Sequence, residues 1–396
     1  MNRLIFEGRL LVNMTGSIIR QDDLRPIHGR LDWERMYRTA DYHRIANIIY
    51  LGILGNGERI PERWSERFFE RYQESLRYSD VCVNAENEIL TLLDMQELSC
   101  TILASCGIRS LYQVAETAAN TPLRLYFDLE SYTLAKGYLV DLGYETDRIY
   151  TGAGERMRRV SGFFVEIYYK FPFKTRLYAK QALNMVEHAN IRNTYRHIRV
   201  LPLEDRFVLR LAEAIYHYVS DELLIREILD IFLYYKSWRE QMNEEYILKK
   251  LSDFNIDGLA QKLMQMACMW FGSKEDITLG ERSEDMGVYD VLENRILSRG
   301  VISKETDTQA ICLQRLIHQA ENKEKHKQRI ERIKKKIGKY WDAYMRRVRW
   351  IFPEYKYMCA IYPLLDKLPF LLPFCWIRRD IRLLVGMILD SSSKHP

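Results

Sequence analysis

Strictly alternating apolar and polar positions mark residues 123–130 as the most regular strand-like stretch of the chain. The apolar positions are Leu123, Leu125, Phe127 and Leu129, and the polar ones are Arg124, Tyr126, Asp128 and Glu130. This period of two is typical of a half-buried β-strand. At a rise of ~3.3 Å per residue, Asp128 and Glu130 would leave one face of such a strand about 7 Å apart. We therefore predict a strand whose polar face carries two neighbouring carboxylates.

The flanking patterns predict a small mixed sheet. Residues 144–150 and 162–169 are interpreted as two further strands, joined by a turn with a basic run, and residues 132–142 as a helix that ends at Gly143. Residues 100–104 are interpreted as the end of the preceding helix. A strand, helix, strand, strand order within some fifty residues favours a small sheet with helices packed on it.

Most of the remaining chain has apolar residues at helical spacing. Asp32 is a suitable N-cap for a helix that starts at Trp33, and a long helical pattern runs from Pro61 to about Met95. After Pro172 the pattern is helical again. We expect an α+β protein with an N-terminal helical region (1–98), an α/β core (99–200), a helical domain (201–273) and a C-terminal helical region (288–396).

The composition is that of a folded protein with a mildly basic charge. Of 396 residues, 47% are hydrophobic and 29% are charged, with a net charge of +5, which argues against a disordered chain. Seven scattered cysteines without a Cys-x-x-Cys make a zinc knuckle or a disulfide framework unlikely as an organising element. Glu7 and Arg9 interrupt the N-terminal apolar run before it could form a signal-peptide core, so we expect a cytoplasmic protein.

The densest charge cluster lies near the C-terminus. Residues 322–349 hold twelve Lys or Arg against three acids, with apolar residues on one helical face. Three interpretations stay open: a solvated helix that packs by its apolar face, a phosphate- or nucleic-acid-binding surface, or a helix lying on anionic lipid. The apolar run 368–377 is broken by two prolines and is too short to span a bilayer, so no transmembrane segment is expected.

Several different short motifs follow one another in a defined order along most of the chain. They are Asp32-Trp33-Glu34, Gly107-Ile108-Arg109, Arg124-x-x-x-Asp128-Leu129-Glu130, Leu142-Gly143-Tyr144-Glu145, Val165-Glu166-Ile167, Ile225-Arg226-x-x-x-Asp230 and Phe352-Pro353-Glu354-Tyr355. Together they resemble the uncharacterised bacterial nucleotidyltransferase family, a branch of the DNA polymerase beta-like superfamily. The resemblance implies a small mixed sheet that forms the nucleotidyltransferase core, flanked by helices.

The resemblance also implies a metal-dependent site. By position, Asp128 and Glu130 correspond to a metal-binding acid pair on one strand and Glu166 to a third acid on a neighbouring strand. Such families bind two Mg²⁺ ions, for which Mn²⁺ can substitute, and transfer a nucleotidyl group from a nucleoside triphosphate to an acceptor. Oxygen ligands suit Mg²⁺; one ion would activate the acceptor hydroxyl and the other would stabilise the leaving pyrophosphate. Arg124, on the polar face with Asp128 and Glu130, would pair with those two acids when metal is absent or meet a phosphate when it is present.

The chain departs from the family pattern at the expected phosphate-binding segment. The family has a Lys-Gly followed by a small residue, whereas this chain has Val114-Ala115-Glu116, where a glutamate would repel a triphosphate. Glu130 replaces the usual aspartate, and Tyr168 stands where histidine often follows the third acid.

Three functional hypotheses follow. The first is a nucleotidyltransferase, with reduced or lost activity, that acts on an unknown small-molecule, protein or RNA acceptor. The second is a catalytically inactive protein of the same fold that binds a nucleotide or a partner, with Tyr126, Tyr132 and Tyr168 lining its pocket. The third is a basic helical protein that associates with RNA or a membrane surface through residues 322–349.

Overall fold

A computed structural model describes residues 5–23, 31–55, 60–273, 279, 286–299 and 352–392. The chain divides into two compact units, Met1–Gln314 and Arg315–Pro396, which are described separately. The α+β class is confirmed, because helices surround a single mixed sheet in the larger unit. The finer division at residues 98, 200 and 273 stays a prediction.

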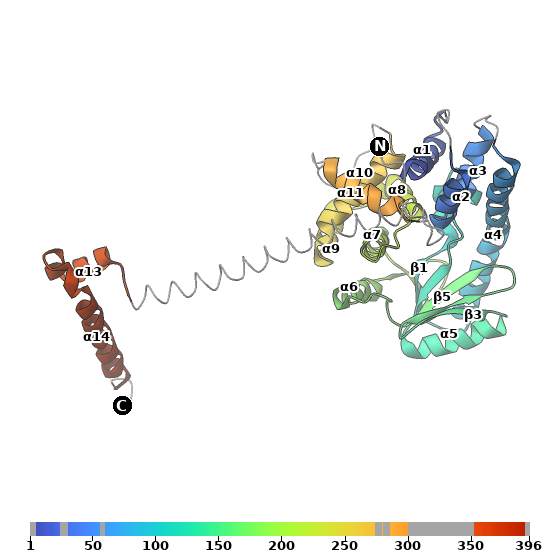
Figure 1. Ribbon diagram of the computed structural model, residues 1–396. Helices are drawn as coiled ribbons and strands as arrows, with labels where there is room; N and C mark the ends of the chain where they lie inside the picture. The colour runs from blue at the N-terminus through green and yellow to red at the C-terminus, as the bar shows by residue number, and fades with distance from the viewer. Residues whose placement is uncertain are drawn as a thin grey trace. The chain divides into compact units, whose positions relative to one another are not determined.

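The sheet of the larger unit has seven strands in the order β3-β4-β5-β2-β1-β7-β6 (Figure 1). The pairs β2–β5 and β1–β7 are parallel, and the other neighbours are antiparallel. The strands are β1 (Cys100–Ala104), β2 (Leu123–Tyr126), β3 (Glu145–Tyr150), β4 (Gly154–Arg158), β5 (Phe164–Tyr168), β6 (Asn190–Ile191) and β7 (Ile198–Val200).

Helices precede, connect and follow these strands, largely as the helical patterns predict. Asp32 caps its helix as expected, since its side chain accepts a hydrogen bond from the Arg35 amide at 3.1 Å. The helices in the described part of the larger unit are α1 (Phe6–Arg20), α2 (Trp33–Tyr42), α3 (Ala46–Gly55), α4 (Glu62–Met95), α5 (Leu129–Asp141), α6 (Arg176–Glu187), α7 (Leu203–Val219), α8 (Ile225–Trp238), α9 (Glu244–Asp253), α10 (Asp257–Phe271) and α11 (Met286–Leu297).

Three local predictions are wrong. Residues 100–104 do not end a helix but form β1, whose five residues are all buried between β2 and β7. The expected turn at 152–159 contains β4, and the strand expected through Glu130 ends at Tyr126. A fully buried strand has no polar alternation, so periodicity alone does not separate it from a helix end.

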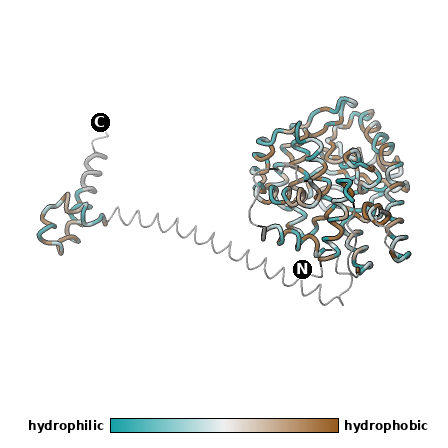
Figure 2. The backbone as a smooth tube through the Cα atoms, turned by 90° about the horizontal axis from the view of Figure 1, so that it is seen from above, coloured by the Kyte–Doolittle hydropathy of each residue, from teal (hydrophilic) through white to brown (hydrophobic). Residues whose placement is uncertain are grey.

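The two faces of the sheet differ in character. Leu123, Leu125, Val165 and Ile167 lie in an apolar core that also contains residues of α4 and α5. The alternate positions, which include Arg124 and Glu166, face the opposite side, where Arg124 contacts α7. Figure 1 shows α5 on one side of the sheet and α7 on the other. Hydrophobic and hydrophilic residues alternate along the elements of this unit (Figure 2).

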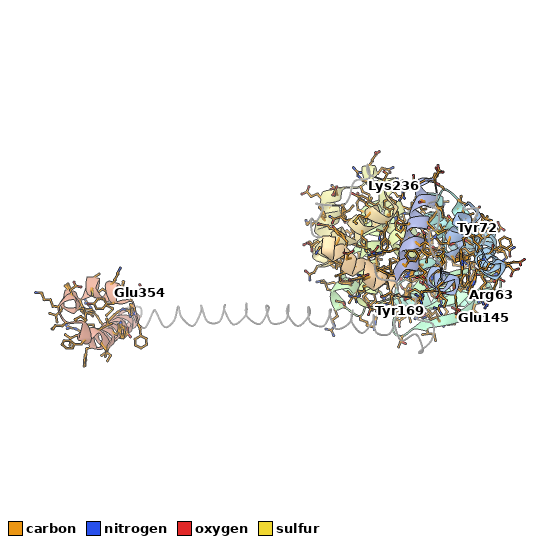
Figure 3. The ribbon with its side chains drawn as sticks, turned by 45° about the horizontal axis from the view of Figure 1, so that its top comes forward. Arg63, Tyr72, Glu145, Tyr169, Lys236 and Glu354 are labelled. Atoms are coloured by element: carbon orange, nitrogen blue, oxygen red, sulfur yellow. The ribbon has the colours of Figure 1, made fainter. Side chains whose placement is uncertain are left out.

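The smaller unit contains α13 (Tyr355–Ile361) and α14 (Leu372–Ser392), with two short 3₁₀ turns between them. Glu354 occupies the N-cap position of α13 (Figure 3). Met358 and Leu365 are buried, whereas Phe370 and Phe374 are 70% and 69% exposed. The basic stretch 322–349 lies outside the described residues, so none of its three interpretations is tested.

None of the helices in the described ranges combines the length and the apolar character needed to cross a bilayer.

Candidate functional site

Arg124 and Glu166 are direct neighbours on the polar face of the sheet. Arg124 on β2 pairs in register with Glu166 on the parallel strand β5. Residues that pair across adjacent strands project from the same face, so both side chains meet there. Nε of Arg124 lies 3.3 Å from Oε2 of Glu166. The carboxylate expected to be the third metal-binding acid is therefore in contact with a guanidinium.

Helix α7 adds a second carboxylate to this arginine. Arg124 donates from Nη1 to Oε2 of Glu213 at 2.9 Å and from Nη2 to Oε1 at 2.7 Å. Such a bidentate geometry is the strongest form of an arginine–carboxylate pair. Burial opposes the charge of both groups, but the pairing outweighs it. The pKa of Arg124 is raised well above its usual value and that of Glu213 is lowered, so both are ionised near neutral pH.

Two tyrosines also contact Glu166, which is buried, with 7% of its surface exposed. Tyr150 donates its hydroxyl to Oε1 at 2.7 Å and Tyr168 donates to Oε2 at 2.8 Å. Burial raises the pKa of both hydroxyl groups, which therefore keep their protons. The two rings stack with centroids 5.4 Å apart. Both oxygens of Glu166 thus have protein donors.

Asp128 and Glu130 belong to the start of a helix and not to a strand. Asp128 is the N-cap of α5: its Oδ1 accepts from the Ser131 amide at 2.9 Å and its Oδ2 from the Ser131 hydroxyl at 2.8 Å. The hydrogen bonds that the Ser131 amide and hydroxyl donate to the carboxylate lower the pKa of Asp128. Glu130 lies in the first helical turn and is exposed. An aspartate cap and an acid in the first turn both stabilise a helix start, which explains why β2 gives way to α5 here.

The three predicted acids are not brought together. Asp128 follows Arg124, the register partner of Glu166, by four residues, which is about 13 Å along an extended chain. Within the described ranges, no group of three or more His, Cys, Asp or Glu side chains is arranged to hold a metal ion. Glu166 is engaged by Arg124, Tyr150 and Tyr168, and Asp128 is exposed at the start of α5, so these acids are not arranged as a two-magnesium site. Their assignment as metal ligands stays a prediction.

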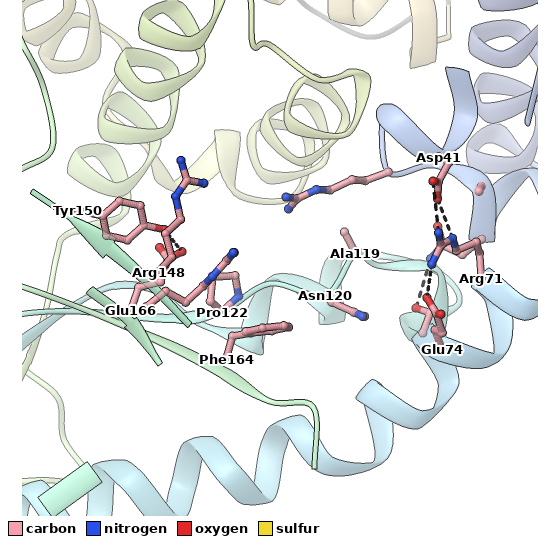
Figure 4. A pocket seen from close by; sticks show the side chains of 15 residues that line it. Asp41, Arg71, Glu74, Ala119, Asn120, Pro122, Arg148, Tyr150, Phe164 and Glu166 are labelled. Atoms are coloured by element: carbon pink, nitrogen blue, oxygen red, sulfur yellow. Dashed lines mark hydrogen bonds and ion pairs between the residues drawn. The ribbon is translucent and has the colours of Figure 1, made fainter. Parts of the chain in front are cut away.

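A cavity of about 480 Å³ opens beside Glu166, between the helices α2–α4 and the strands β3–β5 (Figure 4). In the close-up, Arg148, Tyr150 and Glu166 lie on one side, and Asp41, Arg71 and Glu74 lie on the other. Tyr126, Tyr132 and Tyr168, which were expected to line a pocket, do not line this one. Its lining is formed by Asp41, Arg44, Ala46, Asn47, Arg71, Glu74, Ser75, Ala119, Asn120, Pro122, Arg148, Tyr150, Arg156, Phe164 and Glu166.

Four arginines, here called the cavity arginines, give the cavity its charge: Arg44, Arg71, Arg148 and Arg156. Arg71 pairs with Asp41 and Glu74 at 2.7 and 2.8 Å, and Arg156 pairs with Asp147 at 2.9 Å. Arg44 and Arg148 have no ion pair within the described ranges. The cavity therefore contains two guanidinium groups whose charge is not neutralised by a nearby carboxylate of that part of the chain.

Two of these arginines oppose each other directly. Arg148 on β3 and Arg156 on β4 are register partners in an antiparallel pair, on the same face as Tyr150. Like charges in this position destabilise a sheet. The sequence pattern does not reveal this pair, because the basic run near 156 is typical of a turn. Glu213 and Arg44 were also missed, since only the fold brings helix α7 and the turn between α2 and α3 to the sheet.

The residues of the site lie within a region that matches a known protein family. A family model described as an uncharacterised nucleotidyltransferase matches residues 29–272, which is more than half of the chain and includes every residue of the site. Neither the curated proteins nor the solved structures contain a match to the chain.

Proposed function

Because the chain belongs to the uncharacterised nucleotidyltransferase family, we propose that its cavity binds the phosphate groups of a nucleoside triphosphate. The observation that carries this proposal is the direct opposition of Arg148 and Arg156 at the cavity wall. A polyphosphate placed between them would relieve their repulsion, and arginine is suited to bidentate phosphate contacts. The volume of about 480 Å³ is in the range of small-molecule sites.

Nucleotidyl transfer to an acceptor is the second candidate function, and family membership favours it. The reaction would use two Mg²⁺ or Mn²⁺ ions and an acceptor that is a small molecule, a protein or an RNA. Asp128, Glu130 and Glu166 are the predicted ligands. They would have to be brought together by a rearrangement of β2 and α5, because Asp128 caps α5 and Glu166 is held by Arg124.

Calorimetric titration of the full-length protein with each nucleoside triphosphate, in EDTA and separately in Mg²⁺, tests the first proposal. We expect binding that weakens with added salt and with loss of the phosphates. Replacing Arg148 by serine should weaken binding about tenfold, the equivalent of one charge-assisted contact. Arg158→Ser is the matched control, because it removes the same charge from the neighbouring strand at a residue that does not line the cavity.

Two outcomes would contradict the proposal: no binding of any nucleoside triphosphate, or an equal loss in both serine variants. The second candidate is measured separately, by transfer of label from α-labelled nucleotides in Mg²⁺ or Mn²⁺. Transfer that disappears in Asp128→Ala would support it. No label transfer with any nucleotide or metal would count against it.

We also propose a cytoplasmic location for the protein. All six cysteines in the described part of the chain are free thiols, four of them buried, which suits a reducing compartment. Cell fractionation with an antibody against the full chain would test this, and recovery in an extracytoplasmic fraction would contradict it.

A further inference from the structure

Two carboxylates from different elements, one buried and one partly buried, converge on one side chain of the polar face. Glu166 comes from β5 and Glu213 from α7, and their oxygens lie 2.7 to 3.3 Å from nitrogens of Arg124. We propose that the guanidinium of Arg124 is a built-in cation that takes the place of the divalent ion expected in this family. The inference rests on the proposed nucleotide-binding function for its biological meaning, but its test does not involve a nucleotide.

The strand register identifies position 124 as the critical one. Across a parallel pair, the residue in register with Glu166 is the one best placed to share a bound ion with it, and that residue is Arg124. An acid at this position would add a carboxylate beside Glu166 and Glu213. Arginine contributes a positive charge instead, in addition to that of Arg156, which pairs in register with Glu166 from β4.

The guanidinium uses the oxygens that a metal ion would need. Nη1 and Nη2 donate hydrogen bonds to the two oxygens of Glu213, and Nε lies 3.3 Å from Oε2 of Glu166 as an ion pair without a hydrogen bond. Tyr168 and Tyr150 donate to the oxygens of Glu166 as well. A divalent ion requires several of these same oxygens at close range, and it would be repelled by an arginine that does not deprotonate in proteins.

A permanent cation has a functional consequence. The cavity begins at Glu166 and carries its own arginines, so its positive charge does not depend on dissolved metal. The wild-type protein is therefore expected to bind its phosphate ligand equally well in EDTA and in Mg²⁺.

Mn²⁺ binding by the full-length protein, measured by calorimetry and electron paramagnetic resonance, tests the inference. Wild type should show no Mn²⁺ site that depends on Glu166. Arg124→Asp should acquire one, with affinity at least about tenfold above that of wild type, because ligand charge sets the affinity of oxygen sites. Adding Glu166→Gln to Arg124→Asp should abolish the site. Arg158→Asp is the matched control, since it makes the same charge change on β4 away from the cluster and should gain no site.

The thermal midpoint provides a second readout. Mn²⁺ should raise the unfolding temperature of Arg124→Asp and leave that of wild type unchanged. If Arg124→Asp does not fold even with Mn²⁺, Arg124→Asn replaces it, because asparagine is neutral and still offers an oxygen ligand.

Two results would overturn the inference. One is a wild-type Mn²⁺ site that is lost in Glu166→Gln. The other is a folded variant at position 124 that gains no Mn²⁺ affinity over wild type. A failure to bind nucleotides would refute only the proposed function, because the Mn²⁺ measurements contain none.

Discussion

Arg124 and Glu213 connect the central sheet to helix α7 across 89 residues of sequence, through two hydrogen bonds of 2.9 and 2.7 Å. Both side chains are less than one-fifth exposed, at 19% and 18%. The pair therefore links the polar face of the sheet to helix α7, which covers that face. Its removal should affect the stability of the whole larger unit.

Replacing Arg124 by methionine should lower the free energy of unfolding by about 3 kcal/mol, because Glu213 and Glu166 would be left without their cation. Urea denaturation of Arg124→Met, Glu213→Leu and the double variant forms a complete cycle. We expect the double variant to cost less than the sum of the single variants, by at least about 1 kcal/mol. Additive effects would show that the two side chains do not stabilise each other.

Asp128 should behave as a helix cap in stability measurements. Asp128→Ala is expected to cost about 1 kcal/mol, whereas Asp128→Ser should stay close to wild type, since serine also caps. The cap lowers the pKa of Asp128, so its contribution is present above the pKa of an unfolded aspartate and is lost as the pH falls through the folded value. The difference between the wild type and Asp128→Ala should therefore shrink in acid. Equal losses in the alanine and serine variants would contradict a capping role.

His43 should make the protein sensitive to mild acid. Its ring is fully buried, its Nδ1 accepts a hydrogen bond from the Ile225 amide at 3.2 Å, and burial lowers its pKa to about 3. The unfolded histidine titrates near 6.5, so between these values only the unfolded chain binds the proton, and lowering the pH favours unfolding.

We expect stability to fall by about 1 kcal/mol per pH unit below 6.5 because of this residue. His43→Asn keeps an acceptor for the amide but does not titrate, so its stability should vary less with pH. The measurement is urea denaturation at pH 7, 6 and 5. An unchanged pH dependence in the asparagine variant would show that other groups control it.

Gly154 should tolerate no side chain. It pairs with Tyr168 across β4 and β5, and an added Cβ would lie 2.1 Å from the carbonyl oxygen of Ile167. Gly154→Ala is expected to cost about 2 kcal/mol, since the strands must move apart. Gly137 in α5 is the matched control, because nothing lies within 4 Å of its Cβ position.

Gly137→Ala should raise stability by about 0.5–1 kcal/mol through better helix propensity. Thermal unfolding of both variants measures the contrast. A neutral Gly154→Ala would mean that β4 and β5 can separate without cost.

Sequence patterns identified the helices reliably where each helix has one buried face. The period of 3.6 follows from local geometry, so the Asp32 cap and the long helix before Met95 could be predicted. Strand β1 could not, because all five of its residues are buried and no alternation remains. The strand prediction for residues 127–130 was wrong for a different reason. The helix cap Asp128 and the acid Glu130 continue the alternation of polar and apolar residues, although the backbone already turns into α5.

The chain by itself determined its α+β class, its family resemblance and the presence of an acid at 166 in a strand rich in aromatic residues. Only the tertiary structure decided that this acid meets Arg124 and not Asp128. The reason is that register between β2 and β5, and the approach of α7, depend on packing between segments far apart in sequence. Local periodicity tells on which face a side chain lies, but not which partner it finds there.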